Sequence, residues 1–410
     1  MITTQLREGL KKWLAGVGIL HLAALGLLLR ITAYIVLPPS DYVLYSDSGL
    51  YMYYGRAILS GAKTSVVGVM PIYPVIIALM GDYEYIRALD ILISTATIVV
   101  AYKLADAVFA SRSVAMLSAL ITAAYPLLIF FSLKAMTEPL YIFLLLLSML
   151  FFYEKRISAG SVCMALSLLV RSLLSLLAPL IVFVFSYVTH RCSLKQSLAN
   201  TIRYLAVYVV LLAPWWTYHY VVHGYFAGAQ ENAGAMVFLG TISVGGTFET
   251  TPEPRQLREF LEDHEKAQTD PLERDRALFI RALGSIRENP GNYGRLLALK
   301  LVYFWKPWPT GALRKYTIFV LMSYGPVLLF FFIFLIRDFG RQWKSVLPMV
   351  MIVAYFALMH VILIAGTRYR QPIEPFLIIL ASYSVIDISR RFRAGRCIED
   401  IAAERMKATG

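Results

Sequence analysis

Two acidic residues stand in segments whose neighbours suit chemistry on a hydroxyl group. Asp47 lies in the aromatic segment 43-VLYSDSGLYMYY-54, and Glu138 lies in 132-SLKAMTEPLY-141. A carboxylate can orient or deprotonate an attacking hydroxyl, which is general-base chemistry. A second reading stays open for each residue, because both precede helix-forming segments and could cap those helices. We predict Asp47 and Glu138 as catalytic residues.

Three arginines form the second set of candidates. Arg171 stands between two apolar stretches, and Arg368 and Arg370 open the last one in 367-TRYRQPIEP-375. A guanidinium stays charged and presents a planar fork of donors, which suits a phosphate group. The alternative is that these side chains snorkel to lipid headgroups. Further candidates for contacts with a donor or acceptor are Tyr51, Lys63, Lys134 and His219.

A metal site is a weaker prediction. The six histidines form no H-E-x-x-H pattern, and the three cysteines form no cluster or disulfide framework. We therefore predict no metal ligands and no required cofactor. A divalent ion held between Asp47 and Glu138 remains an alternative, since carboxylate oxygens suit such ions.

The elements that must position these residues are membrane helices. The chain has 410 residues, of which 58% are apolar and 16% charged, and its mean hydropathy is +0.63. The apolar residues form continuous blocks, which predicts an all-α polytopic membrane protein and excludes the alternating pattern of a β-barrel. The first block is too long for a cleavable signal peptide and lacks a small-residue cleavage site, so we expect none.

We expect about ten or eleven transmembrane spans. The segment 160–189 is interpreted as two short spans that meet near Arg171, because a single span would invert the topology of everything that follows. The segment 293–305 is expected to be interfacial or re-entrant rather than spanning. The ten predicted spans are 13–37, 85–109, 113–131, 139–153, 160–171, 173–189, 204–222, 317–336, 345–366 and 372–389.

The charge distribution predicts which ends of these spans face the cytoplasm. The net charge is +13. With the N-terminus inside, eighteen Lys and Arg residues fall on cytoplasmic segments and six on short outer loops. The basic excess is therefore a topology signal, and nucleic acid is not an expected partner. The five candidate acidic and arginine residues all fall on the outer face, which predicts a multi-pass protein of the plasma (inner) membrane with an extracytoplasmic site.

Four regions follow from this topology. Residues 1–222 form an N-terminal transmembrane module whose first outer loop, 38–84, contains an amphipathic helix within 41–61. Residues 223–316 form an extracytoplasmic loop region with interfacial helices. One of these begins at 270-DPLE-273 and ends at 289-NPG-291, with an apolar face of Leu272, Phe279, Leu283 and Ile286. Residues 317–389 are C-terminal transmembrane helices, and 390–410 is a basic cytoplasmic tail.

The ordered set of motifs resembles a known family. The matching stretches are 47-DSGLYMYYGRAILSG-61, 71-PIYPVIIAL-79, 137-TEPLYIFLLL-146, 168-LLVRSLL-174, 213-APWWTYHYVVHGYF-226, 288-ENPGNYGRLLALKLVYFWKP-307 and 368-RYRQPIEPFLIILASY-383. Together they are similar to polyprenyl-phosphate-sugar-dependent glycosyltransferases of the GT-C superfamily, in the branch of dolichyl-phosphate-mannose protein mannosyltransferase-like and aminoarabinose transferase-like enzymes. The resemblance covers nearly the whole chain.

The resemblance implies a GT-C helix bundle and a reaction. Asp47 matches the family's acidic residue in the first outer loop, which acts on the acceptor. Glu138 matches the family's second-loop acidic position, and Arg368 and Arg370 match its arginine-bearing segment before the last helix. The implied enzyme transfers a sugar, with inversion, from a polyprenyl-phosphate donor to a hydroxyl of a protein, lipid or glycan acceptor. The chain departs from the family at Met70, Ser48 and 218-YH-219, which shifts the expected phosphate contacts toward the arginines.

A lipid or lipid-linked-sugar transporter or flippase is the alternative function. A transporter is expected to carry ionisable residues near mid-membrane and a repeat between its halves. The predicted spans are nearly free of charge, and the polar candidates collect at one face. The sequence therefore favours the enzyme, with membrane lipids as its surroundings.

Overall fold

The computed structural model describes residues 18–37, 46–63, 69–225, 233–244, 271–308 and 311–408, and most of these residues are helical. The N-terminal half contains α2 (Ile19–Val36), α3 (Ser46–Ser60), α4 (Ile72–Met80), α5 (Tyr83–Phe109), α6 (Arg112–Ala124), α7 (Pro126–Phe131), α8 (Glu138–Tyr153), α9 (Ile157–Leu168), η2 (Ser172–Leu174), α10 (Ala178–Val184), η3 (Phe185–Thr189) and α11 (Leu194–His223). The C-terminal half contains α12 (Ala233–Ile242), α14 (Pro271–Glu288), α15 (Pro290–Trp305), η4 (Gly311–Tyr316), α16 (Thr317–Ile333), η5 (Phe334–Asp338), α17 (Phe339–Ile362), α18 (Thr367–Arg370), η6 (Gln371–Ile373) and α19 (Glu374–Ala408).

Five helical stretches are long and apolar enough to cross a membrane: Ile19–Val36, Tyr83–Phe109, Leu194–His223, Arg314–Ile362 and Thr367–Arg393. The other predicted spans of the N-terminal half are shorter apolar helices of 10–17 residues. The predicted spans 317–336 and 345–366 join into one helical run, because the π-helical turn Phe334–Asp338 continues the hydrogen-bonding without a break. The all-α, multi-pass membrane architecture is confirmed.

The predicted division of 160–189 into two helices is also confirmed. α9 ends at Leu168, and α10 begins at Ala178 after the single 3-10 turn η2. The backbone of Arg171 is extended at this break, with φ −149° and ψ 115°. The break coincides with the polar pair Arg171-Ser172, which interrupts the apolar sequence. Arg171 therefore lies between two helices rather than within a span.

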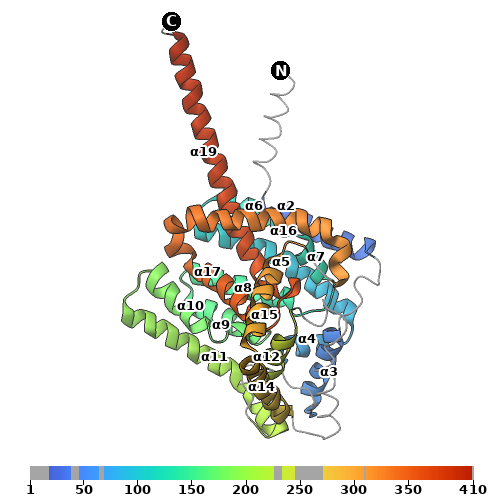
Figure 1. The fold of residues 1–410 in the computed structure, drawn as a ribbon. Helices are drawn as coiled ribbons and strands as arrows, with labels where there is room; N and C mark the ends of the chain where they lie inside the picture. The colour runs from blue at the N-terminus through green and yellow to red at the C-terminus, as the bar shows by residue number, and fades with distance from the viewer. Residues whose placement is uncertain are drawn as a thin grey trace.

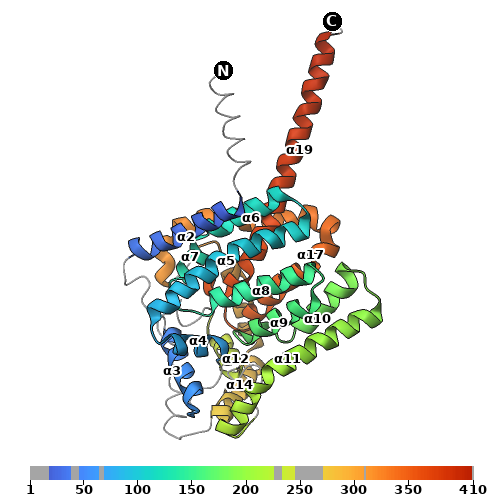
Figure 2. The same ribbon diagram turned by 180° about the vertical axis from the view of Figure 1, so that it is seen from behind.

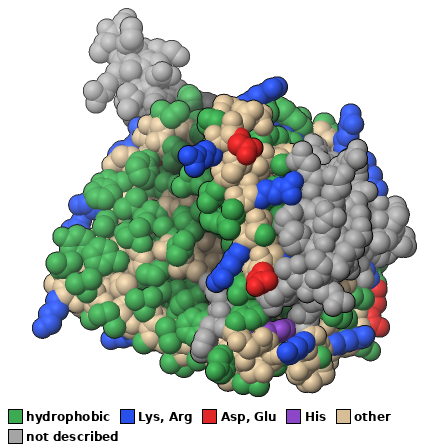
Figure 3. All heavy atoms as spheres, turned by 60° about the horizontal axis from the view of Figure 1, so that its bottom comes forward, with side chains coloured by type: hydrophobic (Ala, Val, Ile, Leu, Met, Phe, Trp, Pro, Cys, Tyr) green, Lys and Arg blue, Asp and Glu red, His purple; other side chains and the backbone are tan. Residues whose placement is uncertain are grey.

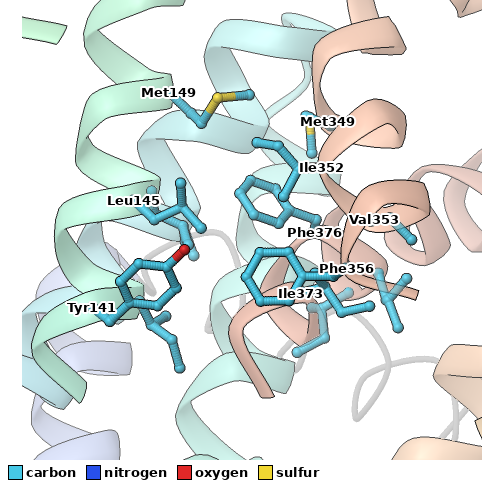
Figure 4. Packing of buried hydrophobic residues seen from close by; sticks show 14 of the residues in the cluster. Tyr141, Leu145, Met149, Met349, Ile352, Val353, Phe356, Ile373 and Phe376 are labelled. Carbon is cyan, nitrogen blue, oxygen red and sulfur yellow. The ribbon is translucent and has the colours of Figure 1, made fainter. Parts of the chain in front are cut away.

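The core of the bundle lies between α8, α17 and the start of α19. Tyr141, Leu145 and Met149 project from α8 at a spacing of four residues, so they share one face of that helix. Figure 4 shows this face opposite Ile352 and Phe356 of α17, with Phe376 of α19 between them. This packing holds the first residue of α8 at a set distance from the segment that precedes α19.

The smaller outer helices gather at one end of the molecule. Figure 1 shows α3, α4, α12 and α14 at the bottom, while the long helix α19 projects from the top toward the C-terminus. Figure 2 shows the same separation from behind. The regions predicted as the first outer loop and as the extracytoplasmic loop therefore lie at the same end.

The close approach of α3 to α4 depends on a glycine. A Cβ atom on Gly55 would lie 1.9 Å from the carbonyl oxygen of Pro74, so no larger residue fits unless the helices separate. α3 buries Tyr51, Met52 and Tyr54. The predicted helix in the first outer loop is confirmed, and Asp47 lies in its first turn; residues 41–45 of the prediction lie outside the described ranges.

α14 begins and ends where its sequence signals predict. Pro271 starts it, Glu288 ends it, and Asn289 then caps α15 by accepting a hydrogen bond from the backbone N–H of Asn292. The predicted apolar face was wrong, because Phe279 and Leu283 are exposed. The helix instead buries Leu278 and Ala282 against α12.

Candidate active site

Four charged side chains form one chain of alternating sign. Nη1 of Arg368 donates to Oδ2 of Asp47 over 2.6 Å, and its Nε donates to Oε1 of Glu138 over 2.6 Å. Nη1 of Arg171 donates to the same Glu138 oxygen over 2.8 Å. Two carboxylates and two guanidiniums give a neutral group, in the order Asp47, Arg368, Glu138, Arg171. We call these four residues the charged cluster.

The middle of the charged cluster is buried and its ends reach the surface. The side chain of Glu138 is 0% exposed and that of Arg368 9% exposed, whereas Asp47 and Arg171 are 23% and 21% exposed. A carboxylate and a guanidinium thus reach the surface on either side of a buried ion pair. A hydroxyl could contact Asp47 while an anion contacts Arg171.

Local structure explains how the two carboxylates, Asp47 and Glu138, come close to each other. Thr137 occupies the N-cap position of α8, so Glu138 is the first helical residue, followed by a proline that suits the first turn. The preceding turn is held by two side chains: Ser48 donates to the carbonyl of Lys134 over 2.9 Å, and Arg87 donates to the carbonyl of Leu133 over 3.1 Å. Because Ser48 follows Asp47 directly, this contact fixes α3 beside the turn that carries Glu138.

A buried polar pair beside the cluster was missed by the sequence analysis. The hydroxyl of Tyr73 donates to Oδ2 of Asp90 over 2.8 Å, and both side chains are at most 1% exposed. The Tyr73 ring packs edge to face against Tyr51, with 5.5 Å between the ring centroids. The available signal was an acidic residue inside the predicted span 85–109. The pKa of Tyr51 is raised to about 12, mainly by burial and secondly by the negative charge of the nearby Asp47 carboxylate. Tyr51 therefore offers a neutral hydroxyl beside Asp47.

Arg370 lies apart from the charged cluster. Its Nε donates to Glu374 over 2.9 Å, and its Nη1 donates to the carbonyls of Phe304 and Lys306 over 2.8 and 3.1 Å. Its guanidinium carbon lies 3.6 Å from the centroid of the Tyr324 ring. These contacts join α15, α16 and α19 around a fully buried guanidinium. The predicted contact between Arg370 and a phosphate stays a prediction, because all of these contacts are with other parts of the protein.

The remaining predicted residues are spread around the site. Lys134 is buried in the turn before α8, with Nζ 4.6 Å from the centroid of the Phe130 ring. Lys63 is exposed after α3, next to Ala62, whose carbonyl accepts a hydrogen bond from Tyr218. His219 is buried in an aromatic group of α11, 4.2 Å from Trp215 between ring centroids. Ion pairs connect none of these three to the charged cluster among the described residues.

An apolar cleft lies near the same end of the bundle. It has a volume of about 230 Å³ and is lined by the outer half of α2, by α7 and by the start of α16, including Leu29, Phe130 and Phe319. The Phe130 ring also contacts Lys134 on the turn that carries Glu138. Figure 3 shows the molecule with the bottom of Figure 1 turned forward, where charged side chains of both signs lie beside a broad hydrophobic surface. The cleft suits an apolar chain whose polar end reaches the turn.

The described residues contain no group of three or more His, Cys, Asp or Glu side chains placed to hold a metal ion. Asp47 and Glu138 are both bonded to Arg368. A divalent ion that took the two carboxylate oxygens bonded to Arg368 would have to displace its guanidinium.

The comparisons with known proteins identify the fold. No protein-family model and no curated protein sequence matches the chain. Among solved structures, the chain is similar to the archaeal oligosaccharyltransferase AglB from Archaeoglobus fulgidus, in complex with an inhibitory peptide and a dolichol-phosphate. The TM-score is 0.55 at 11% sequence identity, over 93% of this chain and 52% of the AglB chain. The chain thus spans about half the length of that protein.

AglB is a member of the GT-C superfamily. At this level of identity the likeness concerns the fold alone: the chain shares the helix-bundle fold of AglB, which agrees with the GT-C type bundle that the resemblance implies.

Proposed function

We propose that the protein is an integral-membrane glycosyltransferase that moves a sugar from a polyprenyl-phosphate donor to a hydroxyl acceptor. The observation that supports this most is the charged cluster, because it offers an accessible carboxylate and an accessible guanidinium on one GT-C fold. The first can act on an acceptor hydroxyl and the second on a phosphate. A protein, a lipid or a glycan could supply the hydroxyl.

In the proposed reaction, the acceptor oxygen attacks the anomeric carbon of the sugar in line with the bond to phosphate. The new carbon–oxygen bond forms as the old one breaks, and the polyprenyl phosphate leaves with the electron pair. The acceptor's proton passes to the Asp47 carboxylate. Arg171 contacts the leaving phosphate, whose negative charge grows in the transition state. Such a single displacement inverts the anomeric centre.

Arg368 and Glu138 act as positioning residues in this mechanism. Arg368 holds the Asp47 carboxylate by one nitrogen and Glu138 by another, so neither acid can turn freely. Glu138 in turn holds Arg171. This assignment differs from the expectation that Arg368 contacts phosphate directly, since two of its nitrogens are already bonded to carboxylates.

The apolar cleft supports a lipid-linked donor. Its lining residues would accept a few isoprene units, and the turn bearing Lys134 lies at its edge. AglB, the structural neighbour, is described with a dolichol-phosphate bound. The proposed displacement requires no cofactor. The arginines are positively charged by themselves, so they can stabilise the leaving phosphate without a divalent ion. Addition of a chelator to the assay tests metal dependence directly.

Asp47→Asn tests the catalytic base. Purified protein is incubated with a radiolabelled polyprenyl-phosphate sugar and envelope extract, and label transfer is measured. We expect transfer to fall at least 100-fold, within the usual range for a lost general base. Asp82→Asn is the matched control, because Asp82 is an exposed carboxylate that caps α5, and asparagine also caps helices.

Turnover of the Asp47→Asn variant near the wild-type level would refute the assignment. Lack of label transfer by the wild type, together with movement of labelled lipid across vesicle membranes, would favour the transporter instead.

Arg171→Gln tests the phosphate contact. Removing a charge-assisted hydrogen bond costs about 1.5–3 kcal/mol, so we expect kcat/KM for the donor to fall roughly 10- to 150-fold. Arg56→Gln is the control, since Arg56 is an exposed arginine of α3 with the same charge change. Equal kinetics for Arg171→Gln and the control would remove Arg171 from the mechanism.

A further inference from the structure

His360 is a polar side chain near the charged cluster that the proposed mechanism does not use. It lies in the last turn of α17, is 7% exposed, and its Nδ1 lies 3.1 Å from the carbonyl oxygen of Ile364. Because a carbonyl oxygen only accepts, Nδ1 carries the hydrogen of this bond. In a neutral imidazole the other nitrogen, Nε2, is then a hydrogen-bond acceptor.

Aromatic contacts place His360 beside the charged cluster. The ring of Tyr141, one turn after Glu138 in α8, lies 6.3 Å from the ring of Phe356, and Figure 4 shows these two side chains between α8 and α17. Phe356 lies in turn 5.9 Å from the ring of His360. His360 also stacks on Tyr369 of α18, with 5.0 Å between ring centroids. These contacts connect the imidazole to both helices that carry the buried ion pair of the cluster.

Arg171 determines the electrostatic surroundings of His360. The positive charge of its guanidinium acts on the imidazole. A second positive charge on the ring would be repelled, which favours the neutral ring with a lone pair on Nε2. Nε2 forms no hydrogen bond within the described part of the chain and is not sealed from solvent. His360 therefore offers an unused acceptor close to the arginine that contacts the phosphate in the proposed mechanism.

We propose that His360 determines donor specificity, because its Nε2 accepts a hydrogen bond from a hydroxyl of the donor sugar. This inference rests on the proposed function, in which Arg171 contacts the phosphate. The sugar is bonded to that phosphate through its anomeric carbon, so the sugar hydroxyls lie beside the group that Arg171 holds. A neutral acceptor suits a hydroxyl and does not repel the phosphate. Such an acceptor favours a lipid phosphate that carries a sugar over the bare lipid phosphate.

Two substitutions separate a sugar contact from a structural role. The side-chain amide of His360→Asn can replace the N–H of Nδ1 and keep the hydrogen bond to Ile364, but it places no atom at Nε2. The longer amide of His360→Gln reaches the position of Nε2 and gives up the bond to Ile364. A sugar contact is therefore lost in the first variant and kept in the second, whereas a purely structural role predicts the opposite order.

Binding is measured by native mass spectrometry of the detergent-solubilised protein with undecaprenyl phosphate and its glucose, mannose and arabinose conjugates. For the conjugate that the wild type binds most tightly, we expect His360→Asn to weaken binding roughly 2- to 13-fold, the effect of one neutral hydrogen bond. Its affinity for undecaprenyl phosphate should not change, and His360→Gln should keep the wild-type preference. The control is His21→Asn, at an exposed histidine of α2, which should match the wild type for every ligand. A wild-type preference in His360→Asn, or an equal loss for the conjugate and the bare lipid, would overturn the proposal.

A spectroscopic measurement on the wild type keeps the proposal testable if His360→Asn does not fold. In protein labelled with nitrogen-15 histidine, the Nε2 signal of His360 is assigned by its absence from the spectrum of His360→Gln. The conjugate should shift this signal more than undecaprenyl phosphate does, because only the conjugate brings a sugar hydroxyl to Nε2. Equal shifts with both ligands would overturn the proposal.

Label transfer by the wild type separates this inference from the proposed function. Transfer together with an unchanged sugar preference in His360→Asn would remove His360 alone from the site. A wild type that transfers no label and prefers no conjugate would refute the proposed function, and the role of His360 with it.

Discussion

The ion pair of Arg368 and Glu138 should be strongly coupled, and a double-mutant cycle measures this coupling. The variants are Arg368→Gln, Glu138→Gln and the double variant. The side chains are 9% and 0% exposed and their polar atoms lie 2.6 Å apart. Two unit charges about 4 Å apart interact by about 4 kcal/mol at an effective dielectric constant of about 20. Removing one partner of such a pair costs about 3–5 kcal/mol, because the other charge stays buried.

The double variant should lose far less than the sum of the single variants. It keeps one carboxylate, Asp47, and one guanidinium, Arg171, both partly exposed, so it leaves no net charge in the site. We therefore expect a coupling free energy of about 3 kcal/mol. The free energy of unfolding is measured by SDS titration in mixed micelles, with helix content followed by circular dichroism.

The matched control for this cycle is the exposed pair of Glu154 and Arg156. Its atoms lie 3.5 Å apart and its side chains are 40% and 59% exposed. Exposed pairs contribute about 0.2–1 kcal/mol, so this cycle should give less than 1 kcal/mol. A coupling below 1 kcal/mol for Arg368 and Glu138, or one equal to the control, would show that the charged cluster is solvated and would refute the argument from burial.

Two predictions concern the packing around the site. Gly55→Ala should destabilise the protein and lower sugar transfer, because the added Cβ would lie 1.9 Å from the carbonyl oxygen of Pro74. Gly49→Ala is the control and should be tolerated, because nothing lies within 4 Å of its added Cβ. Thermal unfolding and transfer activity are measured for both variants, and equal behaviour of the two would contradict the prediction. Lys300→Met should lower stability at neutral pH by about 1–3 kcal/mol, because buried Lys300 donates to the carbonyls of Gly240, Ile362 and Leu363 at the segment that leads to Arg368. Burial lowers the pKa of Lys300 from 10.5 to about 8, so the folded state binds this proton more weakly than the unfolded state, and the wild type should gain stability relative to Lys300→Met as pH rises from 8 to about 10. An identical pH slope in the two proteins would contradict this origin of the effect.

Much of the architecture could be predicted because its causes are local. Apolar blocks determine where helices cross the membrane, and the Asp-Pro and Asn-Pro signals mark both ends of α14. The topology argument also placed Arg171 at a helix break and brought it to the same end as Asp47 and Glu138. Such inferences need only the residues of one segment and the thickness of a bilayer.

Contacts between distant segments could not be predicted in this way. Arg368 and Arg370 stand two residues apart in one motif, yet one bonds to Asp47, 321 positions away, and the other to Glu374, four positions away. Residues two apart on a helical turn point in different directions, and the sequence does not say which direction faces the site. The Tyr73–Asp90 pair was missed for a similar reason, since its hydrogen bond exists only because α4 packs on α5.

The sequence by itself determined that this protein is a bundle of membrane helices with its acidic and basic candidates at one end, because hydrophobicity and charge act on each segment separately. Only the tertiary structure decided that Arg368 joins two carboxylates into a neutral chain while Arg370 braces three helices. The physical reason is that a buried guanidinium is stable only beside partners that satisfy it, and those partners come from packing between helices far apart in the chain.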